Sequence, residues 1–527
     1  MGIPYYFSYL IQNHKEIIEN LENNNVCNSL YLDSNSIIYD CIEFERYEND
    51  DQFEKFIINN VIKKIENIIN VTNPSNLVYI AFDGVPPIAK LTQQKNRRYK
   101  SWYQSNLFNK KIIWDTCAIT PGTKFMTKLN NNITNHFNKY SKSSKCKIIL
   151  SLTDVPGEGE HKICEYIRNN SVPESYIIIY GMDADLIMLS LNHLKYCNNI
   201  YLYRETPHFI KSLDNSLDPN KRYLINNVEL SKQIYKLLVN NNENENEINY
   251  ELFYNKIEDY IFICFLLGND FMPHFPAINI RINGFTILLE LYKELFGKNK
   301  FLTKDGKIVW SNFKKYIGEL AKNEHMFLTE IYNIRNKQSK KYYPENNDAE
   351  KELKFTAMPS WERNIELFIN PYEECWEFRY YYSLFDINID KSDNSIKNIC
   401  INYLETLQWT YYYYSRECIN WSHSYNYEYP PLLSDLYKHI PYFDSELVLT
   451  KNKNVIHEYV LLSYVLSKNS LNLLPRKIHN YLLENYENHY KTDYEFVYAF
   501  CKYFWECHVK FPPIDFENFE KNIKKLT

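Results

Sequence analysis

The chain has 527 residues, of which 45% are hydrophobic and 24% are charged, and its formal net charge is −5. This length predicts two or three domains, and an aromatic share of 16%, with 48 Tyr and 30 Phe, excludes a disordered chain. A net charge so close to zero excludes a uniformly basic coat for nucleic-acid binding, but it allows a local basic patch.

The cysteines and the apolar runs predict the cellular compartment of the protein. The 12 Cys are scattered without any CxxC pair, which argues against a zinc ribbon and against a disulfide framework. The first residues lack a basic segment followed by a long apolar run, so we expect no signal peptide, and the longest apolar run, Tyr260–Leu267, is too short to span a membrane. We therefore expect an intracellular protein without a membrane partner, in the cytoplasm rather than the nucleus. No motif indicates a protein partner.

Five short apolar runs, separated by helical patterns, follow one another in the first 205 residues. They are Ser29–Asn35, Leu77–Gly84, Lys147–Asp154, Ser175–Asp185 and Asn199–Glu205. A helical pattern around Asp51–Asn70 lies between the first two runs. Runs of this length that alternate with helices are typical of a mostly parallel sheet with helices on both faces, so the predicted fold class is α/β.

The sequence changes character after these runs. Residues 240–249 form a polar, low-complexity segment, which predicts a solvated loop inside the first domain. The apolar stretch Tyr250–Leu267 predicts a helix that ends at Gly268. Residues 335–360 are charged and contain proline, and we interpret them as a connector. The predicted domains are thus a first domain at 1–334 and a mainly helical, aromatic-rich region at 361–527.

Seven acidic residues fall at or just beyond the ends of predicted strands or of the apolar helix. They are Asp33, Asp83, Glu158, Glu160, Asp183, Asp185 and Asp270. Any one of them alone is best explained as a helix cap or a turn residue. The carboxyl ends of parallel strands meet at one edge of a sheet, so the shared position of all seven predicts one site. Clustered carboxylates need a cation to stay ionised, and oxygen ligands suit Mg²⁺ or Mn²⁺, which serve phosphoryl chemistry.

A basic segment follows the second predicted strand. Residues 84–114 contain seven Lys or Arg and no acid. On a helix, one face of this segment would carry Lys90, Gln94, Arg97 and Arg98. A solvated helix face explains this pattern when it is taken alone, but its position directly after Asp83 places it beside the acids. Forked arginine donors together with a glutamine suit a terminal phosphate.

The ordered motifs resemble those of the Xrn-type 5′→3′ exoribonucleases. The first set comprises MGIPYYFSYL, LYLDSNSIIYDC, AFDGVPPIAKLTQQKNRRYK, VPGEGEHKI, YGMDADLIML and FLLGNDFMPHFP. A looser second set includes WEFRYYYSLFDI, SLNLLP and FWECHVKFPPIDFENF. The resemblance covers both core regions of that family and nearly the whole chain. It implies a PIN/FEN-like nuclease domain with a mostly parallel sheet, embraced by the helical second region.

The resemblance also implies roles for the candidate residues. The seven acids correspond to the family's metal site for two Mg²⁺ or Mn²⁺ ions. The pocket for a 5′-monophosphate corresponds to Lys90, Gln94, Arg97 and Arg98. The implied reaction is metal-assisted, processive hydrolysis of single-stranded RNA, which releases nucleoside 5′-monophosphates.

The sequence departs from the family at the residues that stack the leading bases. Tyr39 stands where the family has a His, and it can stack on a base but cannot offer imidazole hydrogen bonds. The segment NWSH keeps Trp421 but has His423 in place of a second Trp, so either residue could align with the stacking Trp, and core packing explains Trp421 equally well. A structure-specific 5′ flap or DNA nuclease and a catalytically weak RNA-binding scaffold stay as alternatives. The ordered phosphate motif argues against the first, and the complete set of acids argues against the second.

Overall fold

The computed structural model describes residues 3, 5–23, 26–43, 49–110, 113–205, 217–218, 220–239, 249–387, 393–448 and 451–527. The predicted Asn-rich loop lies outside the described residues except for Asn249. The Asn249 side chain accepts hydrogen bonds from the backbone N–H groups of Glu251 and Leu252, and it thereby caps helix α10 (Tyr250–Cys264).

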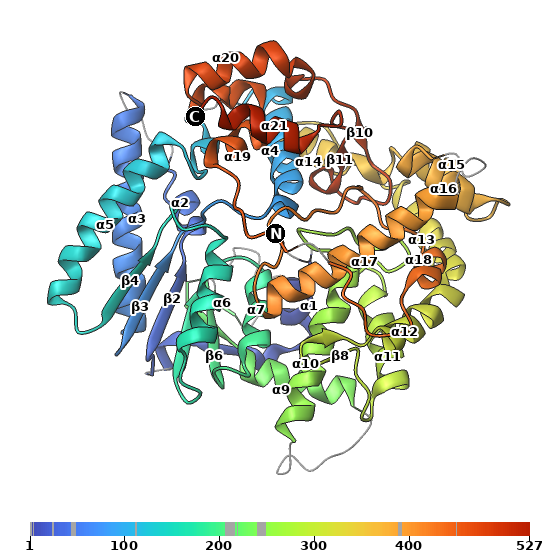
Figure 1. Ribbon diagram of the computed structural model, residues 1–527, viewed down its shortest axis with the longest axis horizontal. Coiled ribbons are helices and arrows are strands. Elements are labelled where there is room, and N and C mark those ends of the chain that lie inside the picture. The colour runs from blue at the N-terminus through green and yellow to red at the C-terminus, as the bar shows by residue number, and fades with distance from the viewer. Residues whose placement is uncertain are drawn as a thin grey trace.

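A seven-stranded sheet organises the first half of the chain, with the strand order β1-β7-β6-β5-β2-β3-β4 (Figure 1). The strands are β1 (Ile18–Asn20), β2 (Ser29–Asp33), β3 (Leu77–Ala81), β4 (Lys147–Ser151), β5 (Tyr176–Tyr180), β6 (Asn199–Arg204) and β7 (Tyr223–Asn226). Strands β2 to β6 run parallel, whereas β1 and β7 pair antiparallel at one edge. The five predicted strands and the mostly parallel sheet are confirmed. The short strands β1 and β7 of this sheet were not predicted, nor were two small two-stranded sheets, β8 (Thr303–Lys304) with β9 (Lys307–Ile308) and β10 (Phe496–Val497) with β11 (His508–Val509).

The order of the strands creates a switch point between β2 and β5. From β2 the chain adds β3 and β4 on one side, and it then crosses back to add β5 and β6 on the other side. The connections that leave β2 and β5 therefore diverge, which opens a crevice at the carboxyl ends of these strands. Asp33 is the last residue of β2, and Asp183 lies three residues after the end of β5.

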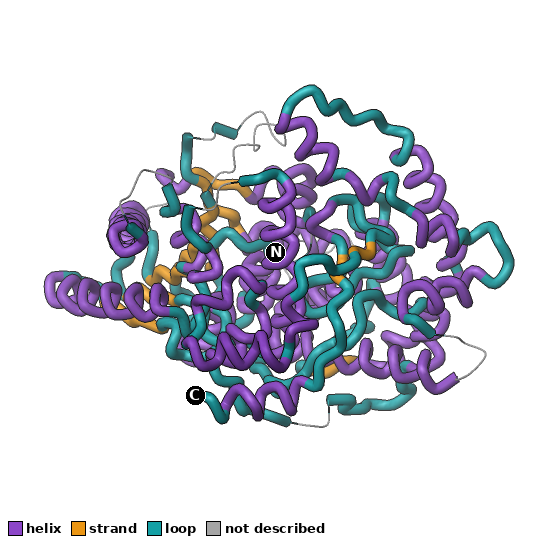
Figure 2. The backbone as a smooth tube through the Cα atoms, turned by 90° about the horizontal axis from the view of Figure 1, so that it is seen from above, coloured by secondary structure: helices purple, strands orange, loops and turns teal. Residues whose placement is uncertain are grey.

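Helices cover both faces of the sheet, as Figure 1 shows and Figure 2 confirms from above. One face packs against α3 (Asp50–Thr72) and α5 (Lys124–Ser143), and the other against α6 (Gly159–Asn170), α7 (Asp185–His193), α9 (Asn227–Leu238) and α10. Alternate residues of β2 enter the two cores: Leu30 and Leu32 join the first, and Tyr31 joins the second. The helix that was predicted around Asp51–Asn70 is confirmed as α3.

The remainder of the described chain is mainly helical. Its helices are α11 (Gly284–Phe296), α12 (Trp310–Lys322), α13 (Glu324–Gln338), α14 (Asp348–Thr356), α15 (Asn364–Ile369), α16 (Trp376–Phe385), α17 (Asp393–Ser415), α18 (Leu433–His439), α19 (Glu458–Val465), α20 (Arg476–Asn485) and α21 (Phe516–Lys524). The predicted connector at 335–360 contains the end of α13 and all of α14. The predicted domain limits themselves stay a prediction. The aromatic character of this region is built into its core, where Trp409 and Tyr411–Tyr414 are buried.

The C-terminal part of the helical region returns to the sheet domain and holds helix α4 (Leu91–Leu107). In Figure 1 the red helices α19 and α21 lie beside the light-blue α4. Lys100 of α4 donates hydrogen bonds to the carbonyl oxygens of Trp505 and Cys507 at 2.5 and 2.6 Å. The N–H of Val509 donates to Asn96 Oδ1 at 2.9 Å. The basic helix is therefore fixed by residues about four hundred positions further along the chain.

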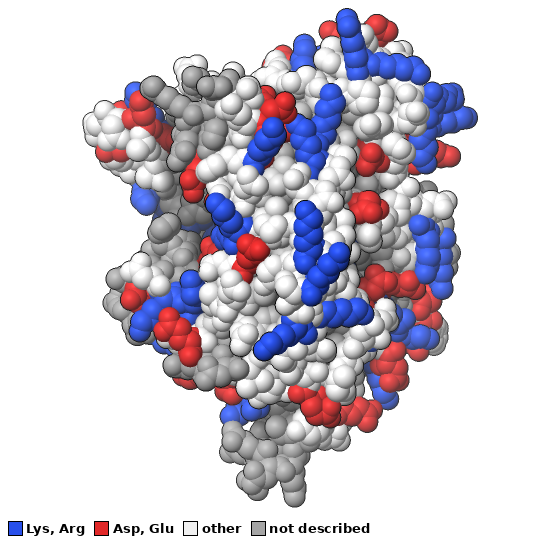
Figure 3. All heavy atoms as spheres, turned by 90° about the vertical axis from the view of Figure 1, so that its left-hand side faces the viewer, with Lys and Arg blue, Asp and Glu red and all other residues white. Residues whose placement is uncertain are grey.

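The surface has no continuous basic coat on the face that Figure 3 displays, where Lys and Arg are spread out with Asp and Glu among and beside them. This agrees with the small net charge. Within the described ranges, no helix combines the length and the apolar character needed to cross a bilayer.

A buried ionic network joins α13, α15 and the C-terminal segment. The carboxylate of Glu366 accepts hydrogen bonds from Arg335 Nε and Nη2 at 2.7 and 2.5 Å, and from Arg363 Nε at 2.6 Å. Glu366 Oε1 also accepts from the N–H of Phe500 at 2.7 Å. All three charged side chains are almost completely buried, so the two arginines depend on this one carboxylate.

We predict that Glu366→Gln lowers the free energy of unfolding by about 3–5 kcal/mol, because it leaves two buried guanidinium groups without their counter-charge. Urea titration followed by tryptophan fluorescence measures this change. Asp348→Asn is the control, since Asp348 pairs with Lys351 while its side chain is 97% exposed, and it is expected to cost less than about 1 kcal/mol. Equal unfolding free energies for the two variants would contradict the prediction.

Candidate functional site

The seven predicted acids come together at the carboxyl edge of the sheet, beside the switch point. Asp33 interacts electrostatically with Asp83, Asp183 and Glu158. Glu160 interacts with Asp183 and Asp185, and Asp185 also with Asp270. Glu158, Glu160, Asp185 and Asp270 are each more than nine-tenths buried. The predicted convergence of these side chains is therefore present in the fold.

The first residue of α6 and Asn35 hold the acid that follows β3. The N–H of Gly159 donates to Asp83 Oδ1 at 2.7 Å, and Asn35 Nδ2 donates to Asp83 Oδ2 at 2.6 Å. A Cβ at Gly159 would lie 2.5 Å from Asp33 Oδ1, so a larger residue here would displace the Asp33 carboxylate. Asn35, two residues after Asp33, was not predicted as part of the site.

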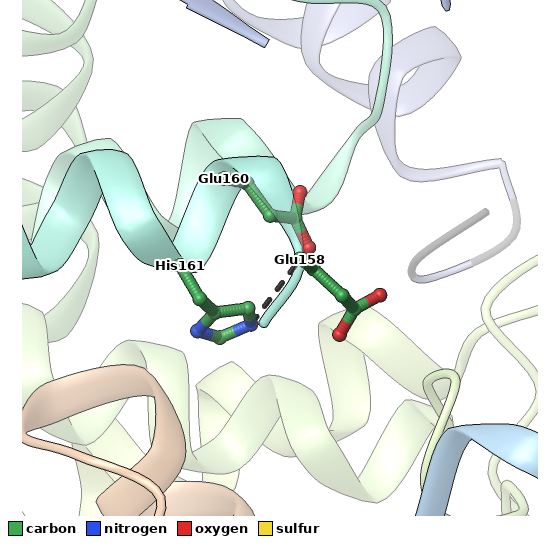
Figure 4. A group of neighbouring side chains, drawn as sticks. All are labelled: Glu158, Glu160 and His161. Carbon is green, nitrogen blue, oxygen red and sulfur yellow. Dashed lines mark ion pairs between the residues drawn. The ribbon is translucent and has the colours of Figure 1, made fainter. Parts of the chain in front are cut away.

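Glu158, Glu160 and His161 form a compact group at the start of α6 (Figure 4). Their ligand atoms all lie within 4.8 Å of one another, and His161 Nε2 is 3.8 Å from Glu160 Oε1. Within the described part of the chain, Glu160 Oε2 and His161 Nε2 are buried and lack a hydrogen-bond partner. His161 was missed from the sequence, although it directly follows the second glutamate.

An aromatic wall from α17 closes the acid cluster on the side of α6. The ring of Tyr413 stacks on His161 with a centroid distance of 3.6 Å and an interplanar angle of 19°. Its hydroxyl donates to Glu158 Oε2 at 3.2 Å. The neighbouring Tyr414 lies edge-on to His161 at 5.7 Å. Burial lowers the pKa of His161 well below its ordinary value, with Lys90 acting in the same direction, so the imidazole is neutral.

Lys90 lies among the acids, apart from the other three predicted phosphate ligands. Its ammonium group is 2.6 Å from Glu158 Oε1 and 2.5 Å from Asp270 Oδ2. Burial acts to lower the pKa of Lys90, but Asp270 and Glu158 raise it well above its ordinary value. Gln93 Nε2 also donates to Asp270 Oδ1, at 3.2 Å. Lys90 therefore serves as a counter-charge to the cluster, and its predicted role as a phosphate ligand stays a prediction.

One lysine does not neutralise the cluster. Burial, together with neighbouring like charges, raises the pKa of Asp33 and of Glu160 well above the ordinary values. The same causes raise the pKa of Asp185 to about 7. Carboxylates in this state bind either protons or a cation. The clustered carboxylates, among them the buried and unpartnered Glu160 Oε2, fit a divalent-cation site, and the neutral imidazole of His161 lies beside them.

A cavity of about 500 Å³ connects the acids with α4. Its acidic wall consists of Asp33, Asp83, Glu158 and Asp183. Its basic wall consists of Gln94, Arg97 and Arg98. Three of the four residues predicted to bind a phosphate thus share one cavity with the acids.

The basic wall offers hydrogen-bonding atoms that the described residues leave unused. Arg98 Nη2 donates to Thr120 Oγ1 at 2.8 Å, whereas Arg98 Nη1 and Gln94 Oε1 are buried without a partner. Arg97 is exposed toward solvent. Arg98 Nη1 is a spare donor and Gln94 Oε1 a spare acceptor. A positively charged wall with a spare guanidinium donor suits an anionic group inside the cavity.

The structure places the three candidate stacking residues in different surroundings. Tyr39 lines the cavity and is 48% exposed, so its ring does not belong to the core. Trp421 is not among the described residues that line the cavity, but its ring reaches the acid-bearing loop, 3.9 Å from where a Cβ on Gly157 would lie. His423 stacks on Trp409 and is hydrogen-bonded to Thr406 Oγ1 at 2.9 Å, so it packs inside the helical region.

The chain matches two family models. The model described as XRN 5'-3' exonuclease N-terminus matches residues 1–206, and the Xrn1 helical domain matches residues 251–366 and 362–527. Together the two matches cover most of the sheet domain and the helical region.

Curated relatives are similar along the same length. The 5'-3' exoribonuclease 1 of Saccharomyces cerevisiae is 27% identical over 618 residues, which cover 90% of this chain and 40% of the relative. The human 5'-3' exoribonuclease 1 is 26% identical over 83% of this chain and 29% of the relative. The 5'-3' exoribonuclease 2 of Arabidopsis thaliana is 27% identical over 65% of this chain and 41% of the relative. The chain spans less than half the length of each of these proteins.

The raised pKa of Asp185 predicts how stability depends on pH in EDTA. The pKa is about 7 in the folded protein and about 3.9 in the unfolded chain, so ionisation of Asp185 destabilises the fold as pH rises to 7. Asp185→Asn is expected to have a higher Tm than the parent protein at pH 8. The gain should shrink steadily between pH 7 and pH 4, because the proton that Asp185 takes up on folding costs less free energy as the pH approaches the pKa of the unfolded chain.

Differential scanning fluorimetry across this pH range provides the measurement. Excess Mn²⁺ should reverse the order at pH 8, since the parent protein keeps a carboxylate that Asp185→Asn lacks. Asp348→Asn serves as the control, with no pH-dependent difference expected. A lower Tm for Asp185→Asn in EDTA at pH 8 would show that this carboxylate stabilises the fold.

Proposed function

This chain belongs to the Xrn family of 5′→3′ exonucleases, and from that premise we propose that it degrades single-stranded RNA from a 5′-monophosphate end. The proposed products are nucleoside 5′-monophosphates, released processively. The observation that carries the proposal is the single cavity in which the buried acids face Gln94, Arg97 and Arg98. A nuclease without a requirement at the 5′ end has no need for this second wall.

We propose Mg²⁺ or Mn²⁺ as the metal, with two ions held by Asp33, Asp83, Glu158, Glu160, Asp183, Asp185 and Asp270. Bound ions of this kind supply a nucleophilic water at neutral pH and stabilise the charge on the leaving oxygen. The chain's own contribution is to position the ligands. Asn35 and the N–H of Gly159 orient Asp83, and Lys90 joins Glu158 to Asp270.

The basic wall is proposed to bind and orient the terminal phosphate. Arg98 is held in place by Thr120, which leaves one nitrogen of its guanidinium directed to other acceptors. A cavity of about 500 Å³ is in the size range of small-ligand sites, so a phosphate bound at this wall keeps the first nucleotide beside the acids. This arrangement accounts for the release of one nucleotide at a time.

We also propose an intracellular, cytoplasmic location. All 12 cysteines are free thiols, and most are buried. A reducing compartment preserves free thiols, whereas secreted proteins tend to pair them.

The test is a cleavage assay with 5′-phosphate, 5′-hydroxyl and capped RNA, and with DNA, in Mg²⁺ and in EDTA. We expect stepwise shortening of 5′-phosphate RNA in Mg²⁺ only, and none with Asp185→Ala, which removes a metal ligand and so several kcal/mol of transition-state stabilisation. Equal rates on all three RNA ends, or a preference for DNA flaps, would favour a structure-specific nuclease. RNA binding without cleavage by the Mg²⁺-loaded protein would favour a scaffold.

The double change Arg97→Ala/Arg98→Ala is predicted to abolish the preference for a 5′-monophosphate while it leaves slow cleavage of 5′-hydroxyl RNA. Loss of charge-assisted hydrogen bonds should reduce kcat/KM on 5′-phosphate RNA by 10²-fold or more, on the order of 1.5–3 kcal/mol per bond. Single-turnover rates on the two substrates measure the ratio. Lys110→Ala, an exposed change at the end of the same basic segment, is the matched control. A preserved ratio in the double variant would refute the assignment of the basic wall.

Tyr39→Ala is predicted to slow processive decay on all RNA sequences alike, because stacking on an aromatic ring is worth roughly 1–3 kcal/mol per base. Tyr39→Phe and Tyr39→His should be mild. The Tm should change little, since half of the side chain already faces solvent. Tyr342→Ala, at a highly exposed tyrosine, is the control. A large drop in Tm with normal specific activity would instead make Tyr39 a structural residue.

A further inference from the structure

Arg204 lines the same cavity as the acids and has no assigned role. It is the last residue of β6, and its guanidinium lies over the ring of Phe7, 4.2 Å from the ring centroid. Its Nε and Nη1 atoms are shielded from solvent, and neither has a hydrogen-bond partner among the described residues. The ring of Phe7 fixes the plane of the guanidinium, so its donors are oriented in advance.

The strand order places Arg204 on the far side of the acids from the basic wall. Strands β6, β5, β2 and β3 are consecutive neighbours, and Asp183, Asp33 and Asp83 follow the last three of them. Helix α4, which carries Arg97 and Arg98, follows β3 along the chain. Three strand spacings separate β6 from β3, which is about 14 Å. The acids therefore lie between two separate sources of positive charge.

A structural role alone does not account for Arg204. Burial lowers the pKa of Arg204 to about 10, while Asp183 acts to raise it, so the side chain stays charged at neutral pH. Buried donors without acceptors cost about 1–3 kcal/mol each, and more for charged groups. The described residues form no ion pair with Arg204 within 4 Å. A charged guanidinium that is held by a ring and belongs to the lining of a cavity is typical of a site for an anion.

We propose that Arg204 binds a non-bridging oxygen of an internal phosphodiester of the substrate, on the opposite side of the acids from the 5′-terminal phosphate. This inference rests on the proposed function, and it adds a second phosphate subsite that the basic wall does not contain. Because the contact is to the backbone, it is independent of base sequence. Arg204 is accordingly a positioning residue for the RNA downstream of the terminal nucleotide.

The test measures binding without cleavage. Fluorescence anisotropy in EDTA compares single-stranded RNA with a 5′-phosphate or a 5′-hydroxyl for the parent protein, Arg204→Gln and Arg204→Lys. Arg416→Gln is the matched control. Arg416 likewise lies over an aromatic ring, that of Tyr412 with its centroid at 4.9 Å, but it is not among the residues that line the cavity.

We expect Arg204→Gln to weaken binding about 10-fold, by the same factor for both 5′ ends. A plot of the logarithm of the binding constant against the logarithm of salt concentration has a negative slope. Its magnitude should be about 0.7 smaller for Arg204→Gln, as expected for the loss of one contact to a single-stranded phosphate. The RNA affinity of Arg204→Lys should lie between those of the parent protein and Arg204→Gln, and that of Arg416→Gln should equal that of the parent protein.

A neutral methylphosphonate at each of the first three linkages in turn then locates the contact. One of these linkages should weaken binding by the parent protein and remove the difference between it and Arg204→Gln. If Arg204→Gln fails to fold, Arg204→Lys takes its place in this comparison, and the same linkage should remove the difference between Arg204→Lys and the parent protein. Three results would each overturn the inference: unchanged binding by folded Arg204→Gln, a loss confined to 5′-phosphate RNA, or no linkage at which the parent protein loses affinity.

The failure of this inference and of the proposed function are distinguishable. If the full pattern of binding is seen but no RNA is cleaved in Mg²⁺, the proposed exoribonuclease activity is wrong and the Arg204 subsite stands. If RNA is cleaved normally and Arg204→Gln changes Mn²⁺ affinity but not RNA affinity, Arg204 is a counter-charge to Asp183 and the subsite is wrong.

Discussion

The structure depends on keeping many carboxylates together at one largely buried edge of the sheet. Like charges at this density raise one another's pKa, so the cluster is stable only with compensating positive charge. Lys90 supplies one unit of it from within the fold, between Glu158 and Asp270. The remaining imbalance is what fits the edge of this sheet to a divalent cation, and the surrounding contacts serve to hold the oxygens in place against their repulsion.

The helical region takes part in this site and does not only cover it. Tyr413 of α17 stacks on His161 and binds Glu158, and the side chain of Asn192 in α7 donates to the carbonyl of Tyr414 at 3.0 Å. These contacts exclude water from one side of the acids. They also connect the position of α17 to the geometry of the ligands, so the sheet domain alone would leave the cluster open to solvent. The chain matches both the N-terminal and the helical family model. The wall that α17 contributes to the acid cluster is a physical reason for the two regions to occur in one chain.

The sheet and the acids could be predicted from the sequence because their signals are local. Each central strand is a continuous apolar run, and Asp33 and Asp83 sit where such runs end. Edge strand β1 has only three residues and no such pattern, so it was missed. Contacts between segments that are distant in the sequence could not be predicted either. The helical spacing placed Lys90 beside Gln94, but Lys90 precedes α4 and turns toward Asp270, 180 positions away. Arg204 and His161 follow recognisable strand and acid motifs, yet only the fold shows that their buried nitrogens lack partners.

The hydrogen bonds that attach α4 to the C-terminal segment have a consequence for the order of folding. The bonds from Tyr99, Lys100 and Asn96 to the segment 494–509 close loops of 395 to 413 residues. Contacts of such long range form late, because the chain must first lose the entropy of closing the loop. During synthesis, the sheet and its acids can assemble while this segment is still inside the ribosome. The helix that carries Arg97 and Arg98 gains its final support only afterwards, so a nascent chain brings the acids together before it has a fixed basic wall.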